Sequence, residues 1–239
     1  MAIGALATEL GVSEMTVRRD LLRLEELGDV RVVPGGVSLR SPAGGTDFRL
    51  RMIAEESEKR AIGRLAASLV PERSVVGIDA GSTSLEVLRA IAPDAGVTVV
   101  TQSLPAMLEV SARRGLELMA LGGALRHEAG SLSGPTTVQQ VADLHLDAAF
   151  IGATAVRDGV ALCGNPYDAE TKRAMRQAAK WAALVVDSRK FERSAMMRIL
   201  PVESFDAIIV DSAIDAAHLA ELRSLGIEVR VAPVANREA

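Results

Sequence analysis

A turn rich in glycine and hydroxyl side chains is the first candidate for chemistry in this sequence. Residues 79–84 read Asp-Ala-Gly-Ser-Thr-Ser and join an apolar run to a helical pattern. Glycine allows close backbone approach, and hydroxyl and N–H groups at a helix N-terminus favour an anion such as phosphate. Serine and threonine are also common helix N-caps. The turn therefore predicts either a phosphate site or a simple helix cap.

Similar polar segments follow other apolar runs of the chain. Thr101-Gln102-Ser103 opens a helical pattern, Gly122-Gly123 ends another run, and 187–191 contains a lysine. Open α/β sheets bind ligands at the carboxyl ends of their strands, so these segments are expected to meet. Glu170 and Lys172 are two residues apart, and they would share a ligand only from an irregular first helical turn.

Lysine is rare in this chain. Of 27 basic residues, only Lys59, Lys172, Lys180 and Lys190 are lysines. Lysine is a compact point charge on a flexible stem, whereas the arginine side chain is a planar fork. Where arginine is the usual cation, a lysine is a candidate for a specific contact.

The N-terminal residues predict two helices joined by a tight turn. Apolar residues over 3–10 have helical spacing, and Gly11 ends that helix. Ser13 is a good N-cap for a second helix, which Gly28 ends. The apolar stripe of the second helix is Val17, Leu21, Leu24 and Leu27. Residues 30–33 and 37–39 flank Pro-Gly-Gly and predict a short hairpin, so the whole segment has a winged-helix pattern.

In a helix-turn-helix, the second helix lies in the major groove with its N-terminal residues at the base edges. Hydroxyls and arginines are suited to phosphate and base-edge contacts. The candidates on this helix are Ser13, Glu14, Thr16, Arg18, Arg19 and Arg23. The alternative is a helical hairpin with a salt-bridged surface. Residues 1–40 hold five arginines against six acidic residues, a balance of −1, which favours that alternative.

The remainder of the chain alternates strand-like and helical patterns. Residues 41–47 are rich in Pro, Gly and Ser and predict a linker, and a helix is expected over 48–70. Predicted strands are 74–80, 97–101, 117–123, 148–154, 182–188, 207–211 and 228–232. Predicted helices are 82–92, 103–114, 135–144, 169–180 and 213–224. Near-continuously apolar strands that alternate with helices predict an α/β fold, in which a mostly parallel, Rossmann-like sheet is covered on both faces.

Composition narrows the class of protein. The chain has 239 residues, 49% of them hydrophobic, and a net charge of −4. This apolar content excludes global disorder, and the apolar runs are too short to cross a membrane. The single cysteine, Cys163, excludes a disulfide framework, and the scattered histidines share no metal-ligand spacing. We expect a cytoplasmic protein with no signal peptide, metal site or cofactor.

Several motifs carry a resemblance to a known family. Residues 12–21 read Val-Ser-Glu-Met-Thr-Val-Arg-Arg-Asp-Leu, and Leu-Glu-Glu-Leu-Gly and a Gly-Gly pair follow. This pattern resembles the DNA-binding domain of DeoR-type transcriptional regulators. The sensor domain of the same family is similar to segments 79–83, 101–103, 121–126, 150–152, 170–175 and 187–191.

The resemblance implies a fold and a function. It implies a winged helix-turn-helix domain over 1–40, a linker over 41–56 and an effector-sensing domain over 57–239. The sensor would be similar in fold to sugar-phosphate isomerases and CoA transferases. The implied partners are double-stranded operator DNA, a phosphorylated sugar or related metabolite, and further copies of the chain in a dimer or tetramer. The implied effector contacts are Asp79, Gly81, Ser82, Thr83, Thr101, Ser103, Gly122, Gly123, Glu170, Lys172 and Lys190.

The sequence also departs from the family pattern. The family has a further helix before the point where this chain begins, so the DNA-binding domain is expected to be truncated. Val32 and Pro34 stand where Arg and His are usual in the wing, which leaves Arg31 as the candidate wing contact. Gln102 replaces a usual Asn, and Thr154 stands where an acidic residue is common. These changes leave the identity of the effector open.

Two other classes of function are also compatible with these residues. A sugar-phosphate isomerase needs a carboxylate base and a cation, which Glu170 with Lys172 or Lys190 would supply. Thr154 and the fused helix-turn-helix argue against this reading. A DNA-binding scaffold without an effector is the third class.

Overall fold

The computed structural model describes residues 1–26, 30–33, 35–39 and 48–234. The chain divides into two compact units, Met1–Pro42 and Ala43–Ala239, which are each described separately. The predicted helix end at Gly28, the Pro34 of the predicted turn and the predicted linker over 41–47 lie outside the described residues.

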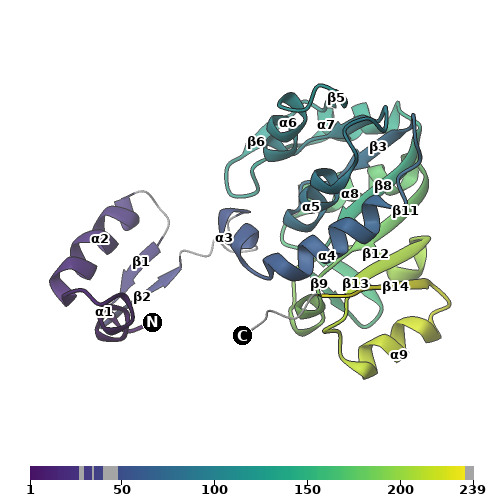
Figure 1. The fold of residues 1–239 in the computed structure, drawn as a ribbon. Helices are drawn as coiled ribbons and strands as arrows, with labels where there is room; N and C mark the ends of the chain where they lie inside the picture. The colour runs from purple at the N-terminus through teal and green to yellow at the C-terminus, as the bar shows by residue number, and fades with distance from the viewer. Residues whose placement is uncertain (27–29, 34, 40–47, 235–239) are drawn as a thin grey trace. The chain divides into compact units, whose positions relative to one another are not determined.

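The first unit contains two helices and a two-stranded antiparallel sheet (Figure 1). Its elements are α1 (Ile3–Leu10), α2 (Glu14–Glu26), β1 (Val30–Val33) and β2 (Gly36–Leu39). Gly11 ends α1 in the left-handed conformation at φ 65°, which glycine adopts without a steric penalty. The buried core is Ile3, Ala7, Val17, Leu21 and Val30. This arrangement confirms the predicted helices and hairpin.

One residue of the predicted apolar stripe is not buried. Leu24 is 38% exposed, whereas Val17 and Leu21 are buried against α1. Helix α1 has only 8 residues, against 13 in α2, so the last turns of α2 extend beyond it. Leu27, the next residue of the stripe, lies outside the described residues.

The second unit is built on a seven-stranded sheet in which all the strands are parallel. The strand order is β14-β13-β11-β8-β3-β4-β5. The strands are β3 (Val75–Ile78), β4 (Thr98–Thr101), β5 (Glu117–Ala120), β8 (Leu146–Gly152), β11 (Ala179–Val185), β13 (Ala207–Asp211) and β14 (Glu228–Ala232). The predicted sheet is therefore confirmed, although several strands begin or end a few residues from the predicted bounds.

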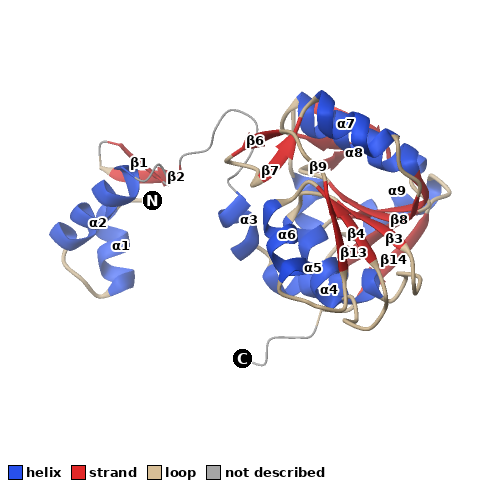
Figure 2. Ribbon diagram, turned by 90° about the horizontal axis from the view of Figure 1, so that it is seen from above, coloured by secondary structure: helices blue, strands red, loops and turns tan. Residues whose placement is uncertain are grey.

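Helices cover both faces of this sheet (Figure 2). The helices are α4 (Glu56–Ala67), α5 (Ser82–Ala90), α6 (Leu104–Ser111), α7 (Pro135–Ala142), α8 (Pro166–Ala178) and α9 (Ala216–Ser224). Alternate residues of one strand face opposite layers, so Phe150 packs in the core with α4, α5 and α6. Ile151 packs in the other core, with α7, α8 and α9. Two buried cores explain why the central strands are almost continuously apolar.

Two small antiparallel sheets were not predicted from the sequence. One is the hairpin of β6 (Ala124–Arg126) and β7 (Ser131–Ser133). The other has the order β12-β10-β9 and contains β9 (Ala155–Arg157), β10 (Val160–Cys163) and β12 (Met197–Pro201). Their strands have only three to five residues, which is too short for a clear hydrophobic period.

The single helix predicted over 48–70 is wrong. The structure has α3 (Phe48–Ile53) and then α4, with Glu55 between them in the left-handed region at φ 50°. A non-glycine residue in that region breaks the helical path. Phe48 is buried in the core of the second unit, although the predicted linker extended to residue 56. In the described part of the chain, no helix is long and apolar enough to cross a membrane.

Candidate functional site

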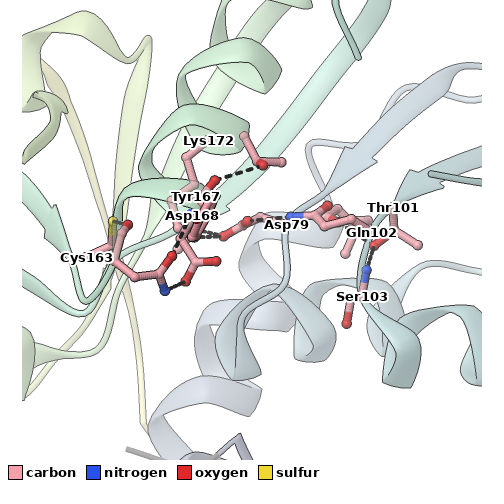
Figure 3. Close-up of polar contacts among 12 residues, drawn as sticks. Asp79, Thr101, Gln102, Ser103, Cys163, Tyr167, Asp168 and Lys172 are labelled. Carbon is pink, nitrogen blue, oxygen red and sulfur yellow. Dashed lines mark hydrogen bonds and ion pairs between the residues drawn. The ribbon is translucent and has the colours of Figure 1, made fainter. Parts of the chain in front are cut away.

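The carboxylate of Asp79 is the centre of a buried polar network at the end of β3 (Figure 3). Gln102 Nε2 donates to Asp79 Oδ1 at 3.1 Å, and the Gly152 N–H donates to Asp79 Oδ2 at 3.0 Å. Lys172 Nζ, from α8, forms an ion pair with the same Oδ2 atom. The network therefore joins the strand ends of β3, β4 and β8 to α8.

This ion pair is almost completely removed from solvent. The side chains of Asp79 and Lys172 are 1% and 8% exposed. Burial by itself would lower the pKa of Lys172, but the nearby carboxylate of Asp79, supported by Asp168, more than offsets it and raises that pKa. Lys172 is therefore held in its charged form.

Thr101 and Ser103 lie beside this network. The Thr101 hydroxyl donates to the Ile78 carbonyl at 2.7 Å and accepts from the Ser103 N–H at 3.1 Å. Ser103 Oγ caps α6 by accepting from the Ala106 N–H at 3.4 Å. Thr101 therefore positions the turn after β4, and Ser103 acts as the N-cap of α6.

The glycine and hydroxyl turn leads from Asp79 into α5. Gly81 precedes the helix, and Ser82 and Thr83 in its first turn are buried. A side-chain carbon at Gly81 would lie 3.3 Å from Ser84 Oγ, so this approach is tight. Ser84 Oγ itself is buried and forms no hydrogen bond with another of the described residues. The turn is therefore close to the Asp79 network, as expected from the strand ends.

Three of the predicted contacts lie elsewhere. The Gly122 N–H donates to Gln140 Oε1 at 2.7 Å, which joins the pair Gly122-Gly123 to α7 beside the edge strand β5. Glu170 is exposed on α8, whereas Lys172 is buried. Two residues along a helix are about 200° apart, so these side chains do not share a face. Glu170 and Lys172, one of the carboxylate–cation pairs considered for an isomerase, are therefore not brought together.

Lys190 belongs to a second part of the site, a cavity of about 410 Å³. It lies in a short 3-10 helix, η1 (Ser188–Glu192), with its Nζ 3.5 Å from Asp187 Oδ2. Burial lowers the pKa of Lys190, although Asp187 opposes this shift. The polar side chains that line the cavity are Arg51, Arg126, His127, Glu128, Thr154, Asn165, Tyr167, Asp168, Lys190 and Arg193.

An aromatic ring and a hydrogen-bonded pair of polar side chains also line the cavity. The guanidinium of Arg126 lies 4.1 Å from the ring centroid of Tyr167. Asn165 caps α8 by accepting from the Asp168 N–H at 2.9 Å, and its Nδ2 donates to Asp168 Oδ2 at 3.0 Å. Asp168 lies one helical turn before Lys172, which connects the cavity with the Asp79 network. The cavity thus offers cations for an anion and an amide–carboxylate pair for hydroxyl groups.

Lys59 is a further buried cation near the cavity. Its Nζ donates to the backbone carbonyls of Arg51 and Ala54, and the residue is 1% exposed. Burial lowers the pKa of Lys59 to about 8, with Asp187 and Lys190 among the charges that act on it. From the sequence, Lys59 is notable only as one of four lysines, and no site role is predicted for it.

The lowered pKa of Lys59 predicts a pH dependence of stability. Between about pH 8 and the ordinary pKa of 10.5, the unfolded chain binds more protons at this residue, so the unfolding free energy should rise with pH. The rise should amount to roughly 3 kcal/mol and should be largely lost in Lys59→Met. Denaturant unfolding at pH 7.5 and pH 10 measures it. Lys180→Met, at an exposed position, is the control, and an identical pH dependence in wild type and Lys59→Met would contradict the assignment.

In the first unit, the predicted DNA contacts lie around the N-terminal half of α2. Ser13 Oγ accepts from the Thr16 N–H at 3.2 Å, which confirms the predicted N-cap. Glu14, Arg18, Arg19 and Arg23 are exposed, and Arg19 Nε lies 3.6 Å from Asp20 Oδ1. Arg31 belongs to β1, and its side chain lies outside the described atoms. The buried Val17 and Leu21 hold the opposite side of α2 against α1.

Four residues that line the cavity could not be assigned to the site from the sequence: Arg51, Arg126, Tyr167 and Arg193. These residues come from α3, β6, α8 and the segment after η1, so their meeting depends on tertiary structure. The available signals were Asp168 at a helix start and the basic run around Lys190.

Comparison with known proteins agrees with the predicted family for both units. A family model described as the DeoR-like helix-turn-helix domain matches residues 1–43, and the DeoR C-terminal sensor domain matches residues 54–212. The chain is 30% identical over 232 residues to a putative aga operon transcriptional repressor of Escherichia coli O157:H7, which covers 95% of this chain and 86% of the relative.

A second relative and a solved structure are also similar. The glycerol-3-phosphate regulon repressor of Escherichia coli K12 is 29% identical over 208 residues, with 87% of this chain and 82% of the relative covered. Ribose 5-phosphate isomerase A from Methanocaldococcus jannaschii has a TM-score of 0.43 and 18% identity, over 58% of this chain and 55% of that one.

The helix-turn-helix match and the relatives define the class of protein. Both of these relatives are named as repressors, one of an operon and one of a regulon, and both family models match this chain in order. The protein is therefore a DNA-binding transcriptional regulator rather than an enzyme. It belongs to the DeoR family.

Proposed function

We propose that this protein represses a carbohydrate-related operon and that a phosphorylated sugar controls its binding to the operator. The cavity that is lined by Lys190 and Arg193 together with the Asn165–Asp168 pair carries this proposal. Cations suit a phosphate, and an amide and a carboxylate suit sugar hydroxyls. The names of the two relatives, an aga operon repressor and a glycerol-3-phosphate regulon repressor, support this class of operon and effector.

The proposed operator contacts are on α2 and the wing. Arg18 and Arg19 are exposed at the part of the helix that would enter the major groove. Ser13 and Thr16 would contact phosphate or base edges, and Arg23 lies one turn further along for backbone phosphate. Glu14 and Arg31 complete the proposed set.

The proposed effector site combines the Asp79 network with the cavity. Lys190 would meet the phosphate, while Asp79 and Lys172 would fix the strand ends that they join. N–H and hydroxyl groups around this ion pair would come from Gly81, Ser82, Thr83, Thr101 and Ser103. The effector would have to extend toward the sheet edge at β5 to contact Gly122 and Gly123, and to the exposed face of α8 to contact Glu170. We also propose a DNA-binding domain over 1–40 and an effector-sensing domain over 57–239 to which α3 is added through the buried Phe48, together with a cytoplasmic location and a homo-oligomer. An effector changes operator affinity only if it binds two states of that oligomer unequally.

A thermal-shift series tests the proposal. Glycerol 3-phosphate, fructose 6-phosphate, ribose 5-phosphate and galactosamine 6-phosphate are compared with glycerol, fructose, ribose and galactosamine. A bound effector at 100 times its dissociation constant should stabilise the protein by about 2.7 kcal/mol, a shift of several degrees, and the unphosphorylated compound should not. The same compound should then change operator affinity.

Lys190→Met should remove the response to the effector and leave operator binding intact, because Lys190 lies in the second unit and the DNA contacts lie in the first. Fluorescence anisotropy of a labelled operator with and without effector measures both properties. Lys180→Met is the matched control. An unchanged effector response in Lys190→Met would remove this lysine from the site.

A further inference from the structure

We propose that Arg51 of α3 binds the effector's phosphate together with Lys190 and Arg193, in competition with Glu55. The inference rests on the proposed function. It identifies the groups that bind the phosphate in the effector site and the way in which binding regulates the protein. In the ligand-free protein, Glu55 neutralises the arginines next to the cavity. A bound phosphate replaces Glu55 as the partner of these arginines. Glu55, which lies between α3 and α4, then loses contacts that hold the two helices in place.

The position of α3 brings Arg51 to the cavity. Phe48 is buried in the core of the second unit, and its N–H donates to the Glu128 carbonyl at 2.9 Å. Arg51 follows on the same short helix and lines the cavity with Glu128, Lys190 and Arg193. The charge of Arg51 contributes to the lowered pKa of Lys190, so the two cations are close in space. The cavity wall therefore includes a cation from the first described element of the second unit.

Glu55 provides the negative charge that pairs with Arg189 and Arg193. Its Oε1 lies 2.9 Å from Arg189 Nη1, and its Oε2 lies 3.8 Å from Arg193 Nη2. The Glu55 side chain is only 8% exposed, whereas those of Arg189 and Arg193 are 65% and 37% exposed, so a buried carboxylate meets two cations that water still reaches. One carboxylate thus faces two guanidinium groups, and one of these also lines the cavity.

A phosphate is a stronger partner for these groups than Glu55. It carries up to two charges and three acceptor oxygens, and guanidinium groups bind it in a bidentate manner. Arg193 is shared between the cavity and Glu55, so a phosphate that attracts Arg193 weakens the hold on Glu55. Binding and release are therefore coupled through one side chain.

The corner that contains Glu55 is suited to two arrangements. Glu55 has φ 50°, a conformation that costs energy for a non-glycine residue and needs support from its surroundings. The support comes from the Arg189 and Arg193 contacts and from Lys59, whose Nζ binds the carbonyls of Arg51 and Ala54. Loss of the Glu55 contacts removes part of this support, and α3 is free to shift.

Helix α3 is also the described element that follows residues 40–47, through which the chain continues from the helix-turn-helix unit. The proposed shift of α3 therefore changes the described element of the second unit that is nearest in sequence to the DNA-reading unit. This gives the effector a covalent route to the operator-binding helix.

The test compares ligand affinity in Arg51→Gln, Arg193→Gln and Glu55→Gln. The probes are inorganic phosphate, glycerol 3-phosphate and fructose 6-phosphate, titrated into the full chain and followed by thermal shift. Arg51→Gln and Arg193→Gln should each weaken binding about tenfold, because each removes a charge-assisted contact. Glu55→Gln should strengthen binding several-fold, because the competing charge is gone. Arg64→Gln and Glu56→Gln, at exposed positions of α4, are the matched controls.

The outcomes separate this inference from the proposed function. If wild type binds a phosphorylated probe and Arg51→Gln or Glu55→Gln binds it with unchanged affinity, the inference is overturned and the proposed function stands. If wild type binds none of the phosphorylated probes or inorganic phosphate, both are overturned. The melting temperature of each variant without ligand shows whether it is folded. If Arg51→Gln is not folded, the ligand affinity of Arg193→Gln tests the inference independently.

Discussion

Replacing Asp79 with asparagine should destabilise the second unit by about 3–5 kcal/mol. Asp79 is the charge partner of Lys172, and both side chains are buried, so the variant leaves a buried ammonium without its counter-ion. The amide would also present a donor or an acceptor where Gln102 and the Gly152 N–H both donate. Thermal unfolding should show a fall in melting temperature of roughly 10 °C.

A double variant isolates the ion pair from the hydrogen bonds. Asp79→Asn with Lys172→Met removes both charges, so it should be more stable than Asp79→Asn alone. Asp158→Asn is a control because Asp158 is 93% exposed and pairs only with Arg157, which is 62% exposed, among the described residues. Strictly additive effects of the two substitutions would show that Asp79 and Lys172 do not stabilise one another.

Replacing Arg18 with alanine should weaken operator binding about ten- to hundredfold. Arg18 is exposed on α2, two residues after the capping pair Ser13 and Thr16, and it has the reach and charge for a base edge or a phosphate. The loss of a guanine contact would cost about 1–3 kcal/mol and relax specificity at one base pair. The loss of a phosphate contact would instead lower the salt slope of binding by roughly one.

Anisotropy titrations at several salt concentrations distinguish these two roles. The operator is first selected from random duplexes with wild-type protein. Arg64→Ala, at an exposed position of the second unit, serves as the control. If Arg18→Ala leaves both the affinity and the salt slope unaltered, α2 does not read DNA through this residue.

The sheet could be predicted from the sequence because its strands are buried on both faces. Residues such as Phe150 and Ile151 face different cores, so the strand is apolar at consecutive positions and is easily recognised. The N-cap at Ser13 was predictable for a related reason, since it depends on residues three positions apart. Such local signals do not need the tertiary structure.

The cavity could not be predicted in the same way. Arg51, Arg126 and Arg193 come from distant parts of the chain, and each resembles a solvated surface arginine in its own segment. Glu170 was a candidate through the family resemblance, and its spacing from Lys172 required an irregular first helical turn for a shared ligand. On a regular helix, that spacing places one side chain in the core and the other in solvent.

The burial of three of the four lysines has a practical consequence. Lys59, Lys172 and Lys190 are 1%, 6% and 5% exposed, so amine-directed reagents should reach only Lys180 among the lysines, together with the N-terminal amine. Lys180 lies at the start of β11, whereas Asp187 and Lys190 follow the end of that strand. A dye or a surface attached at Lys180 would therefore sit at the opposite end of the sheet from the cavity and leave it accessible for binding measurements.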